Sequence, residues 1–175
     1  MKYHLCYLGF VLLLVGCSSP PVNIDYYSLS VETRVSPPAK ITGGSEKKLI
    51  LIESINLAEF LKQPGLVVQT HANKMHLSSQ HRWAESLQQS LPRSLLAKLE
   101  NRMPESRFEG PQSRYKQMPA LRLSYNFSHF HSDSDKGVVV AGSLWISDSE
   151  NRLLLKKKFN IQQPLTTSGY LHSVE

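Results

Sequence analysis

Five of the seven histidines have a spacing that could support chemistry. His71, His76 and His81 recur at five-residue intervals, and His129 and His131 would share one face of a strand. A structural zinc site needs four convergent ligands, and a catalytic one needs three. A five-residue spacing does not place side chains on one helix face, and no cysteine or close carboxylate joins them. We therefore expect surface or turn histidines, no metal site and no cofactor.

The other chemical motifs are incomplete. Asp133 and Asp135 resemble the start of a calcium-binding loop, but the glycine and the distal glutamate of such a loop are not at the required positions. The segment is interpreted as a polar hairpin turn. There is no nucleophile elbow, phosphate-binding loop or zincin motif in the sequence. The residues therefore give no support for an enzyme.

Cys17 is the residue with the clearest predicted modification. It follows the apolar run Leu5–Val15 and comes directly after Gly16, while Lys2 is the single fixed charge before the run. The run is shorter than the roughly 20 residues that span a bilayer, but it is typical of a signal peptide. The pattern is similar to a bacterial lipoprotein signal, which predicts removal of residues 1–16 and lipidation of Cys17. An ordinary signal peptide or a buried apolar segment are the alternatives.

This interpretation sets the domain organisation. Residues 1–16 are the signal peptide, 17–24 a lipidated tether, and 25–175 a single domain. The chain has two cysteines, Cys6 and Cys17, so the predicted domain has neither a disulfide nor thiol chemistry. The net charge of +6 is scattered and accompanies no nucleic-acid-binding motif. We interpret it as a solvated basic surface.

Hydrophobic patterns predict seven strands and two loops. Residues 48–53 form a continuous apolar run that is typical of a strand in the middle of a sheet. Residues 66–70 and 74–78 should pair across Ala72-Asn73, and 56–61 should form a helical turn that ends before Pro64. The other predicted strands are 25–30, 121–128, 138–147 and 152–162, and the loops are 36–45 and 102–120.

The clearest predicted helix is Gln80–Asn101. Ser78 or Ser79 would cap it, Pro92 would kink it and Pro104 would end it. Large apolar residues recur every four positions and form one stripe, which would pack on a sheet or bind a partner. The stripe consists of Trp83, Leu87, Leu91, Leu95 and Leu99.

The predicted fold class is α/β of the α+β type. Residues 121–162 should form a three-stranded antiparallel meander, with polar turns at 131–137 and 148–151. The complete sheet would be mixed and mostly antiparallel, with the one amphipathic helix packed on one face. Lys156, Lys157 and Lys158 are either a solvated patch or, because Lys157 would share a face with Phe159, a contact for anionic lipid or a partner.

Several short segments together carry a family resemblance. They occur in the order of the lipidation signal, Tyr26-Tyr27-Ser28-Leu29, Val68-Gln69-Thr70, and Arg82-Trp83-Ala84-Glu85-Ser86-Leu87 at the start of the predicted helix. The chain resembles the family of ABC-type transport auxiliary lipoproteins over nearly all of its predicted mature length.

The resemblance implies a function. Such a protein would be a non-enzymatic outer-membrane lipoprotein that faces the periplasm. It would work with an inner-membrane component and a periplasm-spanning MCE-domain protein in lipid transport between the membranes, with a homo-oligomer possible. Ser18 follows the cysteine where an aspartate would suggest inner-membrane retention. An assembly or pilot lipoprotein that chaperones an outer-membrane protein is the alternative, and a peptidoglycan or lipid hydrolase is a third class.

The resemblance also implies a difference near the C-terminus. Family members continue beyond the position of Gly169-Tyr170 into a long helix, whereas this sequence stops at Glu175. A sheet with one apolar face needs a cover. We therefore expect a truncated product in which part of the sheet is exposed or is covered by a neighbouring subunit.

Overall fold

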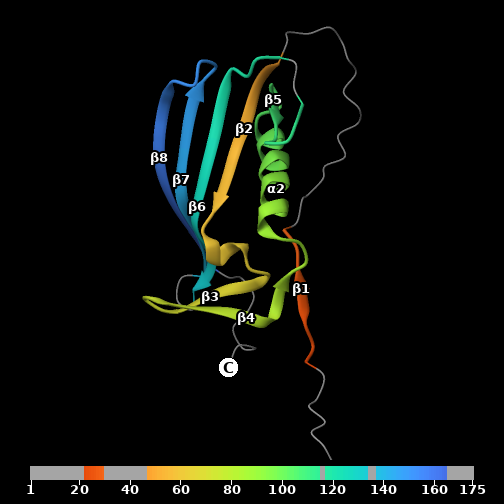
Figure 1. Cartoon of the computed structure of the whole chain (residues 1–175), viewed down its shortest axis with the longest axis vertical. Helices are drawn as coiled ribbons and strands as arrows, with labels where there is room; N and C mark the ends of the chain where they lie inside the picture. Colours follow the sequence, from red (N-terminus) through yellow and green to blue (C-terminus); the bar gives the residue numbers. More distant parts are fainter. Residues whose placement is uncertain (1–21, 30–46, 115–116, 134–136, 165–175) are drawn as a thin grey trace, which may run out of the picture.

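A mixed eight-stranded sheet and one α-helix make up the part of the chain that the structure describes (Figure 1). The computed structural model describes residues 22–29, 47–114, 117–133 and 137–164. The predicted α+β class is confirmed. The elements are β1 (Asp25–Tyr27), β2 (Lys48–Leu57), the 3-10 helix η1 (Glu59–Lys62), β3 (Gly65–His71), β4 (Lys74–Trp83), α2 (Leu87–Arg102), β5 (Ser106–Glu109), β6 (Leu121–Asp133), β7 (Gly137–Asp148) and β8 (Leu153–Gln163).

Strand β6 organises the sheet. Along one edge it pairs in parallel with β2 and then with β3, and along the other it pairs antiparallel with β7. Strand β8 continues antiparallel beside β7, so the predicted meander is confirmed. Strand β2 lies between β6 and β5, and its Leu49–Ile52 segment is buried, which confirms its predicted place inside the sheet. The β3–β4 hairpin also pairs as predicted, with Val68 opposite His76.

The predicted start of the helix was wrong. Residues 80–83 extend β4, and α2 begins at Leu87 with Ser86 at the N-cap. The extension forms because His81–Trp83 pairs in parallel with β1, which satisfies backbone groups that a helix would otherwise use. Ser78 is buried in β4, where its Oγ accepts a hydrogen bond from the His81 N–H at 2.9 Å. Pro92 lies inside α2 as expected, and α2 ends at Arg102, before Pro104.

The predicted loop 102–120 contains a strand. Residues Ser106–Glu109 form β5, which pairs in parallel with the start of β2 and buries Phe108. Four residues are too few to show a clear strand period in the sequence. The remaining loop prediction, 36–45, lies outside the described residues, as do the predicted signal peptide, Cys17, Asp135 and Gly169-Tyr170.

Two apolar clusters join the helix to the sheet. The cluster around the start of α2, here called the lower cluster, contains Leu87 and Leu91 together with residues of η1 and the middle of β6. The second cluster, here called the upper cluster, is centred on β2, and Leu95 and Leu99 pack against it. The buried members are Leu57, Leu61, Val67, Leu87, Leu91 and Phe127 in the lower cluster and Ile50, Ile52, Phe108 and Leu123 in the upper one.

Neither α2 nor any other helix in the described ranges is long and apolar enough to span a membrane.

Candidate functional site

The predicted stripe is divided between two elements. Leu87 and Leu91 are buried on α2 at 2% and 8% exposure, and Leu95 and Leu99 lie further along the same helix, partly exposed. Trp83 lies on β4 instead of on the helix. It contacts Phe130 of β6, with ring centroids 5.9 Å apart. The stripe therefore borders two cavities, one beside Trp83 and one beside α2, which share Phe130 as a lining residue.

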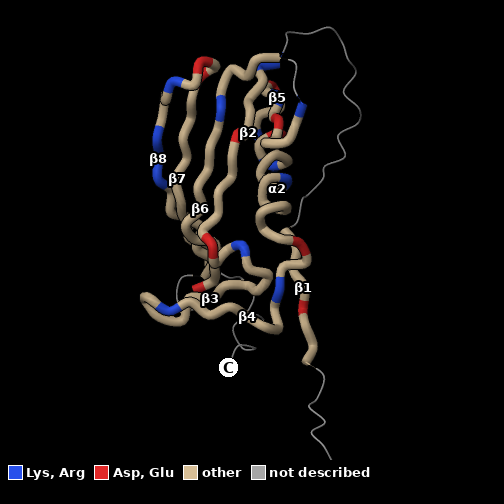
Figure 2. Tube along the Cα trace, viewed as in Figure 1, with Lys and Arg blue, Asp and Glu red and all other residues tan. Residues whose placement is uncertain are grey.

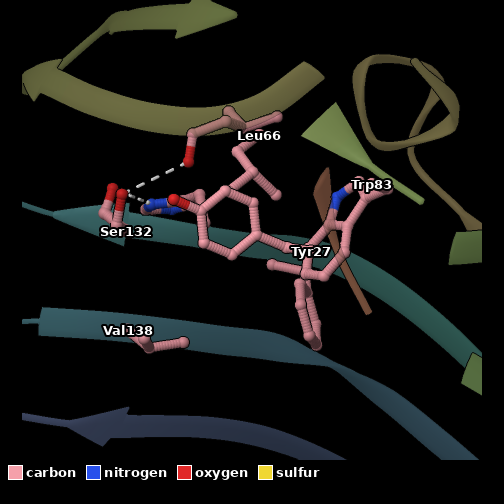
Figure 3. Close-up of a pocket in the computed structure, with 8 residues that line it drawn as sticks. Tyr27, Leu66, Trp83, Ser132 and Val138 are labelled. Carbon is pink, nitrogen blue, oxygen red and sulfur yellow. Dashed lines mark hydrogen bonds between the residues drawn. The ribbon is translucent and has the colours of Figure 1, made fainter. Parts of the chain in front are cut away.

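The Trp83 pocket is the first cavity, and Figure 3 shows it in close-up. Tyr27 of β1, Leu66 of β3 and Trp83 of β4 line one side, while Ser132 of β6 and Val138 of β7 lie on neighbouring strands. Its volume is 280 Å³. The complete lining is Tyr27, Leu66, Val67, Trp83, Phe130, His131, Ser132 and Val138.

His131 of β6 is one of the residues around this pocket, and its side chain is buried. The side chain is 3% exposed, and its Nδ1 lies 3.0 Å from the Ser132 carbonyl oxygen. A carbonyl oxygen accepts only, so Nδ1 is the donor in this contact. The other ring nitrogen, Nε2, is buried and has no hydrogen-bond partner within the described ranges. The Ser132 hydroxyl points to the Val67 carbonyl at 3.5 Å.

A second buried histidine supports the wall of the pocket. His81 of β4 is 5% exposed, and its Nδ1 lies 3.2 Å from the Tyr27 hydroxyl and 3.6 Å from Asp25 Oδ2. This contact links β1 to β4 by side chains as well as by backbone pairing. It therefore holds the Tyr27 ring in place at the edge of the sheet.

The meander groove is the second cavity, and it lies between α2 and the inner face of β6, β7 and β8. Its volume is 530 Å³ and most of its lining is apolar. Phe127 and Phe159 meet edge to face there at 5.5 Å, and Ile161 is 57% exposed. Burial raises the pKa of the Tyr125 hydroxyl above its usual value of 10.0. The lining residues are Leu29, Leu91, Ser94, Leu95, Lys98, Tyr125, Phe127, Phe130, Val140, Phe159 and Ile161.

Cations border the meander groove. Lys98 lines it from α2, and Lys157 shares its strand face with Phe159. Figure 2 shows the basic residues of β8 as a continuous segment at the outer edge of the sheet. Lys156 lies on the opposite face of β8, with its Nζ 5.7 Å from the centroid of the Trp145 ring. The groove therefore combines exposed apolar side chains with positive charge.

The other histidines singled out in the sequence lie on three different strands. His71 is on β3 and His76 on β4, while the rings of His129 and His131 approach to 5.5 Å on β6. Over the described part of the chain, no three His, Cys, Asp or Glu residues form a group that could hold a metal ion. Asp133 is buried at the end of β6, so the predicted polar turn at 131–137 was wrong for residues 131–133, which continue the strand.

The sequence reasoning missed Phe130 and Val138 as lining residues. It predicted His131 as a surface or turn residue, which is wrong, because His131 lies in β6 and is 3% exposed. Inward-facing residues of β6 alternate from Leu121 to Phe127, and the register then shifts between Phe127 and His129. This β-bulge changes which residues face the helix side of the sheet. In the sequence, the large apolar residues fall on odd-numbered positions up to Phe127 and on the even-numbered position Phe130 after it. This change is the signal that could have revealed the bulge.

The comparisons define the class of protein. A family model described as the ABC-type transport auxiliary lipoprotein component matches residues 27–175. The chain belongs to this family, which is a family of transport components and not of enzymes.

Two curated relatives narrow the resemblance. The chain is similar to the intermembrane transport lipoprotein PqiC of Escherichia coli strain K12, at 28% identity over 91% of this chain and 81% of that protein. It is equally similar to PqiC of Shigella flexneri, with the same identity and coverage.

Two crystal structures share the fold. An uncharacterized protein has a TM-score of 0.68 and 21% identity, covering 85% of this chain and 84% of the other. Protein XCC0632 from Xanthomonas campestris has a TM-score of 0.55 and 16% identity, covering 82% and 80%.

Proposed function

We propose that this chain is a non-enzymatic, lipid-anchored outer-membrane component of an intermembrane transport system. In this proposal it docks a periplasm-spanning MCE-domain protein that also contacts an inner-membrane component. The family membership supports the transport role, because the family comprises auxiliary lipoproteins of ABC-type transport. The name of the two curated relatives, intermembrane transport lipoprotein, supports a position between two membranes.

In this proposal Cys17 is the attachment point and residues 17–24 are the tether. Eight extended residues reach at most roughly 26–29 Å. The domain would then remain close to the membrane surface, with β1 as its nearest ordered element. Because one acyl chain anchors a protein only marginally, stable attachment requires at least two chains on the modified cysteine.

The meander groove is the docking surface in this proposal. The observation that supports it best is the exposed apolar face of β8, where Phe159 lines the groove and Ile161 is 57% exposed. Clustered exposed apolar side chains beside a concave surface are typical of interaction sites. The Oγ of Ser94 in the same lining is buried and has no hydrogen-bond partner in the described ranges.

The charge of the groove indicates what kind of segment it accepts. Lys98 and Lys157 are both positive and lie on the groove side. An apolar partner segment flanked by Asp or Glu would bury its apolar side chains against Phe159 and place its carboxylates near the two ammonium groups. Charge complementarity of this kind chiefly favours fast and specific association.

Matched variants on the two faces of β8 test the docking surface. Ile161→Asp places a carboxylate in the groove, whereas Gln162→Asp places the same group on the opposite face. Each full-length variant is purified from solubilised envelopes by affinity, and the recovered MCE-domain protein is quantified by mass spectrometry. We expect Ile161→Asp to reduce recovery about tenfold or more, because it buries an unpaired charge. Gln162→Asp should match the wild type.

The same design applies to charge. Lys157→Glu should lower recovery of the partner, and Lys156→Glu should have a smaller effect because Lys156 contacts Trp145 on the other face. Equal recovery by both members of each pair would refute the groove as the docking surface. If wild-type envelopes yield an outer-membrane protein in place of an MCE-domain protein, the assembly-factor alternative replaces the proposed function.

A further inference from the structure

We infer that the outer face of β1 rests on a phospholipid surface, in the headgroup layer of the membrane that holds the anchor. The residues of this surface, here called the β1 face, are Val22, Ile24, Tyr26 and Arg82. The face contacts lipid through apolar side chains and one cation, and it orients the domain on the membrane. The inference rests on the proposed anchor at Cys17 and adds a second, weaker membrane contact made by the fold itself.

The exposed apolar side chains around β1 are the first observation. Val22 and Tyr26 are each 63% exposed, and Ile24 is 38% exposed. Single exposed apolar residues are common on protein surfaces, but a cluster of them marks an interaction site. Tyrosine is enriched at membrane interfaces because its ring is apolar and its hydroxyl tip remains hydrated. Three such side chains within five consecutive residues therefore form an apolar strip.

The pairing of β1 with β4 places the strip and a cation on one face. Tyr26 is the register partner of Arg82, so the two side chains lie on the same side of the sheet. Ile24 comes two residues before Tyr26, and in an extended chain its side chain points to the same side. The β1 face therefore has the composition of an interfacial surface, in which apolar groups lie beside a basic one.

The intervening residues of β1 point to the inner face. Asp25 Oδ2 lies 3.6 Å from His81 Nδ1, and the Tyr27 hydroxyl lies 3.2 Å from the same nitrogen. These contacts hold the carboxylate of β1 on the side of the sheet away from the strip. The β1 face therefore carries positive charge without a carboxylate from its own strand.

Arg82 supplies a group that suits phosphate. Its Nε donates a hydrogen bond to the Ser79 carbonyl at 3.0 Å, which orients the side chain along β4. Within the described ranges no carboxylate pairs with the guanidinium group. The planar guanidinium binds phosphate oxygens through two parallel N–H groups. A phospholipid headgroup next to Tyr26 would therefore find a donor in place.

The length of chain before β1 identifies the occupant as lipid. Five residues lie between the modified position, Cys17, and Val22, and five extended residues reach at most roughly 17–18 Å. The anchor therefore keeps the β1 face next to the headgroups. Three apolar side chains and an arginine also fall far short of the roughly 800 Å² that each partner buries in a stable protein interface. A lipid contact needs no such area, because the anchor already holds the domain at the membrane.

Site-specific fluorescence on the lipidated full chain tests the inference. In the proposed mature protein Cys6 is removed and Cys17 is lipidated, so a thiol-reactive NBD dye labels only an introduced cysteine. Asn23→Cys places the dye beside the strip and leaves all four residues of the β1 face intact. Leu154→Cys is the control, at a 58% exposed position on β8. Figure 1 shows β1 towards one end of the long axis and the turn between β7 and β8 at the other.

Each labelled protein is reconstituted into vesicles of phosphatidylethanolamine and phosphatidylglycerol that contain a nitroxide-labelled phospholipid. The fluorescence lifetimes give the ratio of quenched to unquenched dye. We expect the dye at position 23 to lose most of its emission, because the face lies within about 5–10 Å of the boundary between headgroups and acyl chains. The dye at position 154 should lose little.

Val22→Asp tests the apolar part of the contact. Val22 precedes the residues that pair with β4, so the substitution leaves the strand hydrogen bonds in place. We expect the ratio of quenched to unquenched dye at position 23 to fall about tenfold, because a carboxylate replaces an apolar side chain at the lipid surface. Leu153→Asp, at a 57% exposed position on β8, should leave the ratio unchanged. Ile24→Asp serves as the second variant if circular dichroism shows that Val22→Asp does not fold.

Arg82→Glu and Arg82→Lys test the cation. In vesicles that contain phosphatidylglycerol, Arg82→Glu should lower the ratio about fivefold or more, the effect expected for removal of one cation near an anionic surface. Arg82→Lys keeps the charge and should retain most of the contact. In vesicles of phosphatidylcholine alone, the effect of Arg82→Glu should be smaller.

Equal quenching of the dyes at positions 23 and 154 would overturn the inference. It would also be overturned if the dye at position 23 were shielded from aqueous iodide but not quenched by the nitroxide lipid, because protein would then cover the β1 face. Quenching that persists unchanged in folded Val22→Asp and Arg82→Glu would refute the contact as described. Dye uptake by the wild type would reveal a free thiol at Cys17. That result refutes the proposed anchor and is distinguishable from failure of the β1 contact.

Discussion

Gly142 is the position where a single methyl group should destabilise the fold most. It lies on β7 opposite Phe127, next to the register shift in β6. A Cβ at this position would lie 2.1 Å from the Asn126 carbonyl oxygen and 2.9 Å from Cζ of Phe159. The nearer contact is with backbone, which cannot move without breaking the β6–β7 ladder. Glycine is therefore required here by the close approach of two strands and an aromatic ring.

The expected cost of Gly142→Ala follows from these contacts. Overpacking a well-packed core by one methyl group costs about 1–3 kcal/mol, and a backbone clash belongs at or above the upper end of that range. For a domain of this size, 1 kcal/mol corresponds to a shift in Tm of roughly 2–4 °C. We expect Gly142→Ala to reduce the free energy of unfolding by about 3 kcal/mol or more, and to lower Tm by roughly 6–12 °C.

Gly110→Ala is the matched control. A Cβ at Gly110 would lie 3.1 Å from Leu96 Cδ1, the end of a flexible side chain, so we expect a change of less than about 1 kcal/mol. Both variants are compared with the wild type by thermal and urea denaturation followed by circular dichroism. If Gly142→Ala is no less stable than Gly110→Ala, the packing argument for the β6–β7–β8 meander is refuted.

Three further predictions concern the core, pH and the anchor. Leu87→Ala should cost about 2–5 kcal/mol in urea denaturation, because Leu87 is 2% exposed and no solvent would fill the cavity; a cost below 1 kcal/mol would contradict its place in the core. Hydrogen bonds from Arg107 and Arg152 hold the pKa values of Glu109 and Asp148 below their usual 4.5 and 3.8. The two ionised carboxylates therefore stabilise the fold above pH 4.5, and this stability should be lost as the pH falls through their lowered pKa values. Glu109→Gln should weaken this dependence of Tm on pH, and an unchanged profile would contradict it. Cys17→Ala should abolish lipidation and outer-membrane fractionation, and normal fractionation would exclude Cys17 as the anchor.

Much of the fold could be predicted because its elements have long, regular patterns. The meander spans β6 to β8 with polar residues at both turns, and the Ala72-Asn73 turn joins two strands that pair locally. The apolar run at Leu49–Ile52 indicated a buried strand, because four consecutive apolar residues present side chains to both faces of a sheet.

The errors arose where tertiary pairing overrides local pattern. Residues 80–83 fit the helical stripe, but parallel pairing of His81–Trp83 with β1 places them in a strand, and the partner strand is more than fifty residues away in sequence. Strand β5 also depends on a distant partner, β2. Local periodicity carries no information about such pairings, so the helix start and the edge strand could not be predicted from it.

The two candidate surfaces are connected through one aromatic residue. Phe130 lines both the Trp83 pocket and the meander groove, because the register shift after Phe127 turns it toward the helix side of the sheet. Phe130→Ala would therefore enlarge both cavities and could not assign a function to either. Of these two cavities, Val138 lines only the Trp83 pocket and Ile161 lines only the meander groove. Because these two side chains lie on different strands, substitutions at them can separate the effects of the Trp83 pocket from those of the meander groove.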